Sequence, residues 1–172
     1  MRTRQAIRRT VLVAGLAGAL MGAAIASAAG GTGVGTHNTK DGKILANSRG
    51  FSLYMFKKDK QHGKSTCYGQ CAKVWPPLLT TGKPVALRGS GVNSRLLGTT
   101  RRKDGKLEVT YNGWPLYLYA PDRKPGQVNG EGANQFGAPW YLLNTSGNIV
   151  KPKSSCPAGY VMSSTGCVPN SY

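Results

Sequence analysis

One internal repeat constrains the fold of this chain more than any other feature. Residues 53–59 read Leu-Tyr-Met-Phe-Lys-Lys-Asp, and residues 116–122 read Leu-Tyr-Leu-Tyr-Ala-Pro-Asp. The same offset of 63 residues aligns residues 40–59 with residues 103–122 without a gap, and eight of these positions are identical. A segment repeated in this way indicates one structural unit written twice. We therefore expect two pseudo-symmetric units packed together.

The second copy carries the clearest signal for a β-hairpin. Residues 107–111 are a strand candidate, Asn112-Gly113 is the dipeptide preferred in a type I′ turn, and residues 114–119 run back. In the first copy, residues 44–47 and 51–57 hold the equivalent positions. Side chains alternate between the two faces of a strand, and both faces of the returning segment are largely apolar. This pattern predicts a strand buried on both sides, or one that leaves an aromatic face free.

Each hairpin is followed by a segment that ends in a Trp and a Leu-Leu pair, at residues 72–79 and 136–143. Residues 82–98 are a polar connector with one strand candidate at 85–87, and a last strand is expected at 148–151. The sequence therefore predicts an all-β domain made of two pseudo-symmetric, hairpin-based repeats. We expect these repeats to form a small sandwich or barrel, with a short helical turn at the Cys-x-x-x-Cys segment.

The first residues read as an export signal. Four arginines precede an apolar run at residues 11–25, and Ala26-Ser27-Ala28 resembles a cleavage site. We expect a signal peptide at residues 1–28, with an uncleaved anchor and a twin-arginine signal as alternatives. Residues 29–39 are rich in glycine and predict a flexible leader.

These boundaries divide the rest of the chain into two parts. Residues 40–151 are expected to form the two-repeat domain, with repeat one at 40–80 and repeat two at 103–145. Residues 152–172 are expected to form a tail that a disulfide closes. No transmembrane span is expected in the mature chain, and the sequence leaves the oligomeric state open.

The four cysteines predict two disulfides. All of them follow the expected signal peptide, and an even number of cysteines in an exported chain favours disulfide bonds. Three pairings are open, and we favour Cys67–Cys71 with Cys156–Cys167. Residues four apart on a helical turn lie on one face, close to disulfide distance.

Positive charge dominates the composition. The chain has 23 Lys and Arg against six Asp and Glu, a net charge of +17. Without the four signal arginines the mature net charge is about +13. The interpretations are an evenly cationic, soluble surface or attraction to anionic cell-envelope polymers or lipid headgroups. Only residues 101–103 form a compact basic run, and no nucleic-acid-binding motif occurs, so we expect no nucleic-acid partner.

Several separated motifs resemble one known family. Residues 54–59 and 117–122 fit the pattern Y-x-[FWY]-x-x-D, and they occur with Cys-x-x-x-Cys-Ala-x-Val-Trp-Pro-Pro-Leu at 67–78 and Tyr-Asn-Gly-Trp-Pro-Leu-Tyr at 111–117. Over residues 40–145 the chain resembles the bacterial secreted-repeat family, often described as predicted lipoproteins with this motif. The resemblance implies a secreted or lipid-anchored protein built from tandem repeats, and it implies no reaction. Because no cysteine lies near the expected cleavage site, we do not expect a lipid anchor there.

The repeated motif supplies the candidate functional residues: Tyr54, Phe56, Asp59, Tyr117, Tyr119 and Asp122. Asp59 and Asp122 are either two carboxylates paired for acid–base work or cation binding, or turn caps that accept backbone N–H bonds. The aromatic side chains either stack on sugars or fill the core. We favour the structural interpretation in both cases.

A second group of candidates surrounds the first cysteine pair. Cys67 and Cys71, with His62 and Met55 nearby in sequence, suggest a soft-metal or redox site. The usual redox spacing is Cys-x-x-Cys, however, so a structural disulfide is favoured and no metal is expected. No nucleophile elbow and no metalloprotease motif occurs.

The sequence thus favours an exported, envelope-associated protein without enzymatic activity that binds a ligand or an anionic surface polymer. We expect no cofactor. The alternatives are an extracytoplasmic redox or metal-handling protein that uses Cys67 and Cys71, and a hydrolase with Asp59 and Asp122 as paired carboxylates.

Overall fold

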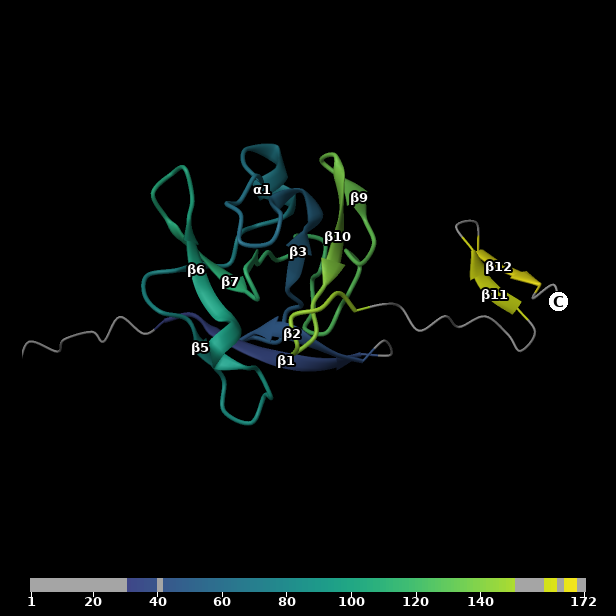
Figure 1. The fold of residues 1–172 in the computed structure, drawn as a ribbon, viewed down its shortest axis with the longest axis horizontal. Helices are drawn as coiled ribbons and strands as arrows, with labels where there is room; N and C mark the ends of the chain where they lie inside the picture. The colour runs from purple at the N-terminus through teal and green to yellow at the C-terminus, as the bar shows by residue number, and fades with distance from the viewer. Residues whose placement is uncertain (1–30, 40–41, 151–159, 164–165, 170–172) are drawn as a thin grey trace, which may run out of the picture.

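The computed structural model describes residues 31–39, 42–150, 160–163 and 166–169. The expected signal peptide and Cys156 lie outside these residues. Twelve short strands and almost no helix make up the described part of the chain (Figure 1), which confirms the all-β prediction. The strands are β1 (Gly33–Thr39), β2 (Gly42–Asn47), β3 (Tyr54–Phe56), β4 (Leu79–Thr80), β5 (Val85–Ala86), β6 (Leu97–Arg101), β7 (Leu107–Tyr111), β8 (Trp114–Pro115), β9 (Asn134–Gln135), β10 (Ala138–Leu142), β11 (Tyr160–Ser163) and β12 (Gly166–Pro169).

Short helical turns interrupt the strands at three places: α1 (Gln70–Val74) and the 3-10 turns η1 (Lys57–Asp59) and η2 (Ser94–Leu96). The sheets have the strand orders β2-β1-β5, β3-β10-β9 and β4-β7-β6, with β8 paired to β7, and β11 pairs with β12. The sheets of the described residues do not close into a barrel, so the barrel alternative is wrong.

The turn of the second hairpin forms as predicted, but its returning strand ends at Pro115 rather than Tyr119. β7 pairs with β8 across Asn112 and Gly113, which have φ angles of 47° and 78°. The first copy differs, because only a bridge between Ala46 and Ser52 joins its returning segment to β2. β3 pairs instead with β10 of the second repeat. The two repeats are therefore joined within one sheet.

The prediction of a flexible leader is wrong over residues 33–39. These residues form β1, which pairs with β2 in antiparallel register and with β5 in parallel register. The glycines here serve packing rather than flexibility. A Cβ atom at Gly33 or Gly35 would lie 2.8 or 3.0 Å from a methyl group of Leu87, while Val34 between them is fully buried.

Two other segments carry more structure than expected. β6 begins at the end of the predicted polar connector and pairs with β7. β11 and β12 form an antiparallel hairpin within the predicted tail. Conversely, the predicted last strand is reduced among the described residues to one bridge between Leu143 and Ile149.

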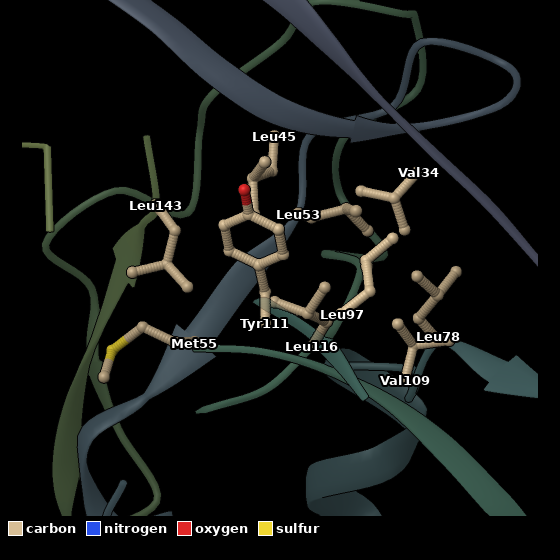
Figure 2. Packing of buried hydrophobic residues seen from close by; sticks show 10 residues of the cluster. All are labelled: Val34, Leu45, Leu53, Met55, Leu78, Leu97, Val109, Tyr111, Leu116 and Leu143. Atoms are coloured by element: carbon tan, nitrogen blue, oxygen red, sulfur yellow. The ribbon is translucent and has the colours of Figure 1, made fainter. Parts of the chain in front are cut away.

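Two buried clusters form the core, and the returning segment of the first repeat contributes side chains to both. Leu53 and Met55 lie in the first cluster, which Figure 2 shows, while Tyr54 and Phe56 lie in the second. All four side chains are at most 1% exposed. Burial of such a side chain contributes about 1.5–3 kcal/mol. The prediction of a strand buried on both sides is confirmed.

The described part of the chain has no helix with the length and apolar character that a bilayer crossing requires.

Candidate functional site

The two copies of the motif meet at a pseudo-twofold axis. The backbone N–H of Tyr54 donates to the carbonyl of Tyr117 at 2.8 Å, and the N–H of Tyr117 donates to the carbonyl of Tyr54 at 2.9 Å. The two tyrosines are related by the repeat offset. The axis therefore passes between them, where the first half of the fold contacts the second.

Each tyrosine hydroxyl donates a hydrogen bond to the aspartate of the other repeat. Tyr54 donates to Asp122 Oδ2 at 2.8 Å, and Tyr117 donates to Asp59 Oδ2 at 2.5 Å. Burial, together with the neighbouring carboxylate, raises the pKa of both tyrosines, so the hydroxyls remain protonated donors. The motif thus forms two crossed bonds between repeats.

The second oxygen of each carboxylate closes a loop of its own repeat. Asp59 Oδ1 accepts bonds from the backbone N–H and hydroxyl of Thr66, at 2.7 and 2.6 Å. Asp122 Oδ1 accepts bonds from the backbone N–H and side-chain amide of Asn129, at 3.1 and 3.0 Å. Thr66 and Asn129 are also related by the offset of 63. Both aspartates therefore have the geometry of a loop cap.

Both carboxylates are buried, and this limits their access to a substrate. Asp59 is 3% exposed and Asp122 is 7% exposed. Burial raises the pKa of each carboxyl group, although the bonds from the loop and the tyrosine oppose the shift. Four surface hollows among the described residues are lined by other side chains. The geometry favours a structural use of both aspartates over acid–base chemistry on a substrate.

A buried ionic network extends from Asp59. The Tyr117 hydroxyl lies 2.7 Å from Ser65 Oγ, and Arg102 donates to this Oγ at 2.6 Å. Arg102 also donates to Glu108 Oε2 at 2.6 Å. Burial raises the pKa of Glu108 to about 7, even though the guanidinium of Arg102 opposes the shift.

The sequence alone does not predict this network. Arg102 stands in a basic run that reads as exposed, yet it is only 4% exposed. The repeat itself points to Glu108, because the equivalent position of the first repeat holds the apolar residue Leu45. An acid at a core position of a strand predicts a buried partner, since an unpaired buried charge is costly.

Aromatic rings from alternating repeats form a stack beneath the crossed bonds. Phe56, Trp140, Trp75 and Tyr119 follow one another, with ring centroids 4.0, 4.0 and 4.2 Å apart. Both tryptophans are fully buried. Phe56 and Tyr119 therefore belong to the core and its margin, and this arrangement favours packing over sugar binding for the aromatic candidates.

The disulfide predicted between Cys67 and Cys71 is confirmed, with a Cα–Cα distance of 5.2 Å. Both cysteines are buried in the second cluster, whereas Met55 lies in the first cluster and His62 is exposed. The structure does not bring these four candidates together. No group of three His, Cys, Asp or Glu side chains among the described residues could hold a metal ion. The pair Cys156–Cys167 stays a prediction, because Cys156 lies outside the described residues.

Comparison with known proteins places the chain in a family. A fold of two repeats joined by crossed bonds defines a tandem-repeat protein, and a family model described as a secreted repeat of unknown function matches residues 35–79 and 98–144. These segments make up more than half of the chain and coincide with its two units. The chain belongs to this family of secreted repeats, which places it outside the cytoplasm. No curated protein and no solved structure matches the chain.

Proposed function

We propose that this protein is a non-enzymatic component of the cell envelope, held there by attraction to an anionic surface polymer. The observation that carries the proposal is the way the fold separates its charges. Of the sixteen described Lys and Arg side chains, fifteen are exposed, and the exception is Arg102. The exposed charges of the described residues are therefore predominantly positive.

The acids are distributed in the opposite way. Asp59, Glu108 and Asp122 are buried in the networks described above. Glu131 is partly buried and accepts a bond from the backbone of Leu142 at 2.6 Å. Only Asp104 is exposed among the described acids. Its carboxylate oxygens lie 3.9 Å from Arg102 Nε and 3.9 Å from Lys106 Nζ. The surface is thus more one-sided in charge than the composition alone indicates.

Such a surface supports long-range, salt-sensitive attraction rather than recognition of one shape. Exposed charges are screened over about 10 Å at 0.1 M salt and about 3 Å at 1 M salt. We therefore expect retention on a polyanion to fall steeply as salt is raised. A neutral polysaccharide should not retain the protein at any salt concentration.

The test is retention on immobilised polyphosphate and on neutral dextran, measured over a range of sodium chloride concentrations. Two matched variants test whether binding depends on the total positive charge or on one group of lysines and arginines. One replaces Lys57, Lys58 and Lys60 with Gln, and the other replaces Lys43, Arg49 and Arg88 with Gln. The two should weaken binding to a similar extent, each by less than about tenfold, because single exposed charges contribute little. Binding that ignores salt, or that one triple variant abolishes while the other leaves it intact, would contradict the proposal.

A further inference from the structure

The turn between β9 and β10 exposes an aromatic ring in an unfavourable backbone conformation. Phe136 and Gly137 form a two-residue turn with φ angles of 57° and 90°. Phe136 is 41% exposed and is the only aromatic among the large apolar side chains that stand out from the described surface. Figure 1 shows this turn at the same end of the domain as α1.

Phe is a poor choice for this turn on local grounds. The first central position of such a turn needs a positive φ, which suits Asn, Asp or Gly and is an outlier for a bulky residue. The same protein uses the preferred Asn112-Gly113 pair between β7 and β8. Phe136 belongs to neither core cluster, so packing in the core does not account for this residue at the turn. Residues strained in this way are typical of functional sites.

The base of the hairpin is held rigidly by the aromatic stack. Trp75 Nε1 donates to Gln135 Oε1 at 2.9 Å, and Trp140 Nε1 donates to the Gln135 carbonyl at 3.2 Å. Both indoles are fully buried, so the residue before Phe136 is anchored in the core. The ring of Phe136 is therefore presented from a fixed support.

A lysine contacts the backbone of this turn. Lys58 Nζ donates to the Phe136 carbonyl at 3.3 Å and lies 3.6 Å from where a Cβ atom of Gly137 would be. Lys57 and Lys60 are exposed and lie within two residues of Lys58 in the sequence, and Lys57 Nζ lies over the ring of Trp114. An exposed apolar ring on a turn that a lysine contacts, on a surface with one exposed acid among the described residues, matches the headgroup region of an anionic bilayer. Apolar contact and charge together are the two signals that stable attachment to a membrane surface needs.

We propose that the β9–β10 turn docks this protein on an anionic lipid surface, with the ring of Phe136 inserted among the headgroups and Lys58 against the lipid phosphates. This goes beyond attraction to a polymer, which needs charge alone. The proposal predicts a contact that depends on one apolar side chain and survives moderate salt better than binding to polyphosphate does.

The experiment compares binding to vesicles of phosphatidylglycerol and phosphatidylcholine with binding to vesicles of phosphatidylcholine alone, using flotation of the secreted chain. Phe136→Asn should lower the partition coefficient on anionic vesicles about tenfold, a difference of about 1.4 kcal/mol. The same change should leave the melting temperature equal or higher, because Asn suits the turn. Lys58→Gln should lower binding about threefold on anionic vesicles only. Val85→Thr and Lys43→Gln are the matched controls at other exposed sites and should change little.

Phe136→Trp provides direct evidence of insertion, since its fluorescence should shift to shorter wavelength with anionic vesicles. Unchanged vesicle binding by Phe136→Asn would overturn the proposal, as would a wild-type chain that does not bind the anionic vesicles. An equal loss on polyphosphate would also overturn it, because the turn would then be a general polyanion contact. Polymer retention that persists in Phe136→Asn keeps this test separate from that of the proposed function.

Discussion

Removal of the Tyr54 hydroxyl should weaken the fold through Asp122, which lies 68 residues away in the sequence. The motif alone suggests a different partner, because Asp59 follows Tyr54 by only five positions. A double-mutant cycle separates these two possibilities. The cycle combines Tyr54→Phe with Asp122→Asn, and the matched control cycle combines Tyr54→Phe with Asp59→Asn.

The magnitude follows from the geometry of the crossed bonds. A hydrogen bond to a charged group contributes about 1.5–3 kcal/mol, and one between neutral groups about 1 kcal/mol. Asp122 keeps two bonds from Asn129 when the tyrosine hydroxyl is removed. We therefore expect Tyr54→Phe to lower the free energy of unfolding by about 2 kcal/mol, with a coupling to Asp122→Asn of about 1 kcal/mol.

The equivalent change at Tyr117 should cost more. Both tyrosine side chains are fully buried, but the hydroxyl of Tyr117 also contacts Ser65, which accepts a bond from Arg102. The second contact of the Tyr54 hydroxyl is a longer bond, accepted from the Gly130 N–H at 3.3 Å. Loss of the Tyr117 hydroxyl breaks a connected ionic network, so we expect about 3 kcal/mol for Tyr117→Phe.

Urea unfolding near pH 7, followed by tryptophan fluorescence, measures all of these changes. Trp75 and Trp140 are fully buried and report on the region where the repeats meet. The slope of free energy against urea should stay constant across the variants. A coupling of Tyr54→Phe to Asp59→Asn that exceeds its coupling to Asp122→Asn would refute the crossed arrangement, as would additivity in both cycles within about 0.3 kcal/mol.

Three further predictions follow from other contacts. Burial raises the pKa of Glu108 from 4.5 to about 7, so the folded state retains a proton that the unfolded chain loses. The free energy of unfolding should therefore fall by up to about 3 kcal/mol as pH rises through this window, and Glu108→Gln should flatten this part of a urea-unfolding pH series. Gly130→Ala would place a Cβ atom 2.6 Å from the buried ring of Trp75, so it should lower stability by about 1–3 kcal/mol and change the tryptophan fluorescence. Replacement of both Cys67 and Cys71 with Ala should lower stability by about 2 kcal/mol, and reduction of the wild-type protein should give a similar loss in urea unfolding.

The parts of the fold that could be predicted are those that depend on neighbouring residues. The Asn112-Gly113 turn and the Cys67–Cys71 bridge need only the local sequence, and both are confirmed. The alternation at residues 51–57 predicts a strand with two apolar faces, and the two core clusters account for it. In each case a short-range rule carries the whole signal.

The parts that could not be predicted depend on a partner distant in the sequence. The glycines of β1 suggest a flexible segment in the sequence, but in the fold Leu87 packs against them. Arg102 suggests a surface charge in the sequence, but in the fold it is buried and donates to Glu108 and Ser65. The crossed bonds were missed for the same reason, because the motif shows which residues recur but not which copy supplies each partner.

The crossed bonds explain why the motif occurs twice, and they direct the search for function elsewhere. The carboxylate of one copy is completed by the tyrosine of the other, so the motif joins the repeats, and these tyrosine and aspartate side chains are buried in both copies. Features that differ between the copies and face solvent are then better candidates for a role in binding. Lys57 and Lys58 correspond by the repeat offset to Ala120 and Pro121, so this basic pair belongs to the first copy alone. Phe136 belongs to the second copy, and the fold places it against Lys58 of the first. The surface that we propose to dock on lipid is thus formed only when both copies are present, although neither Lys58 nor Phe136 occupies a fixed position of the shared motif.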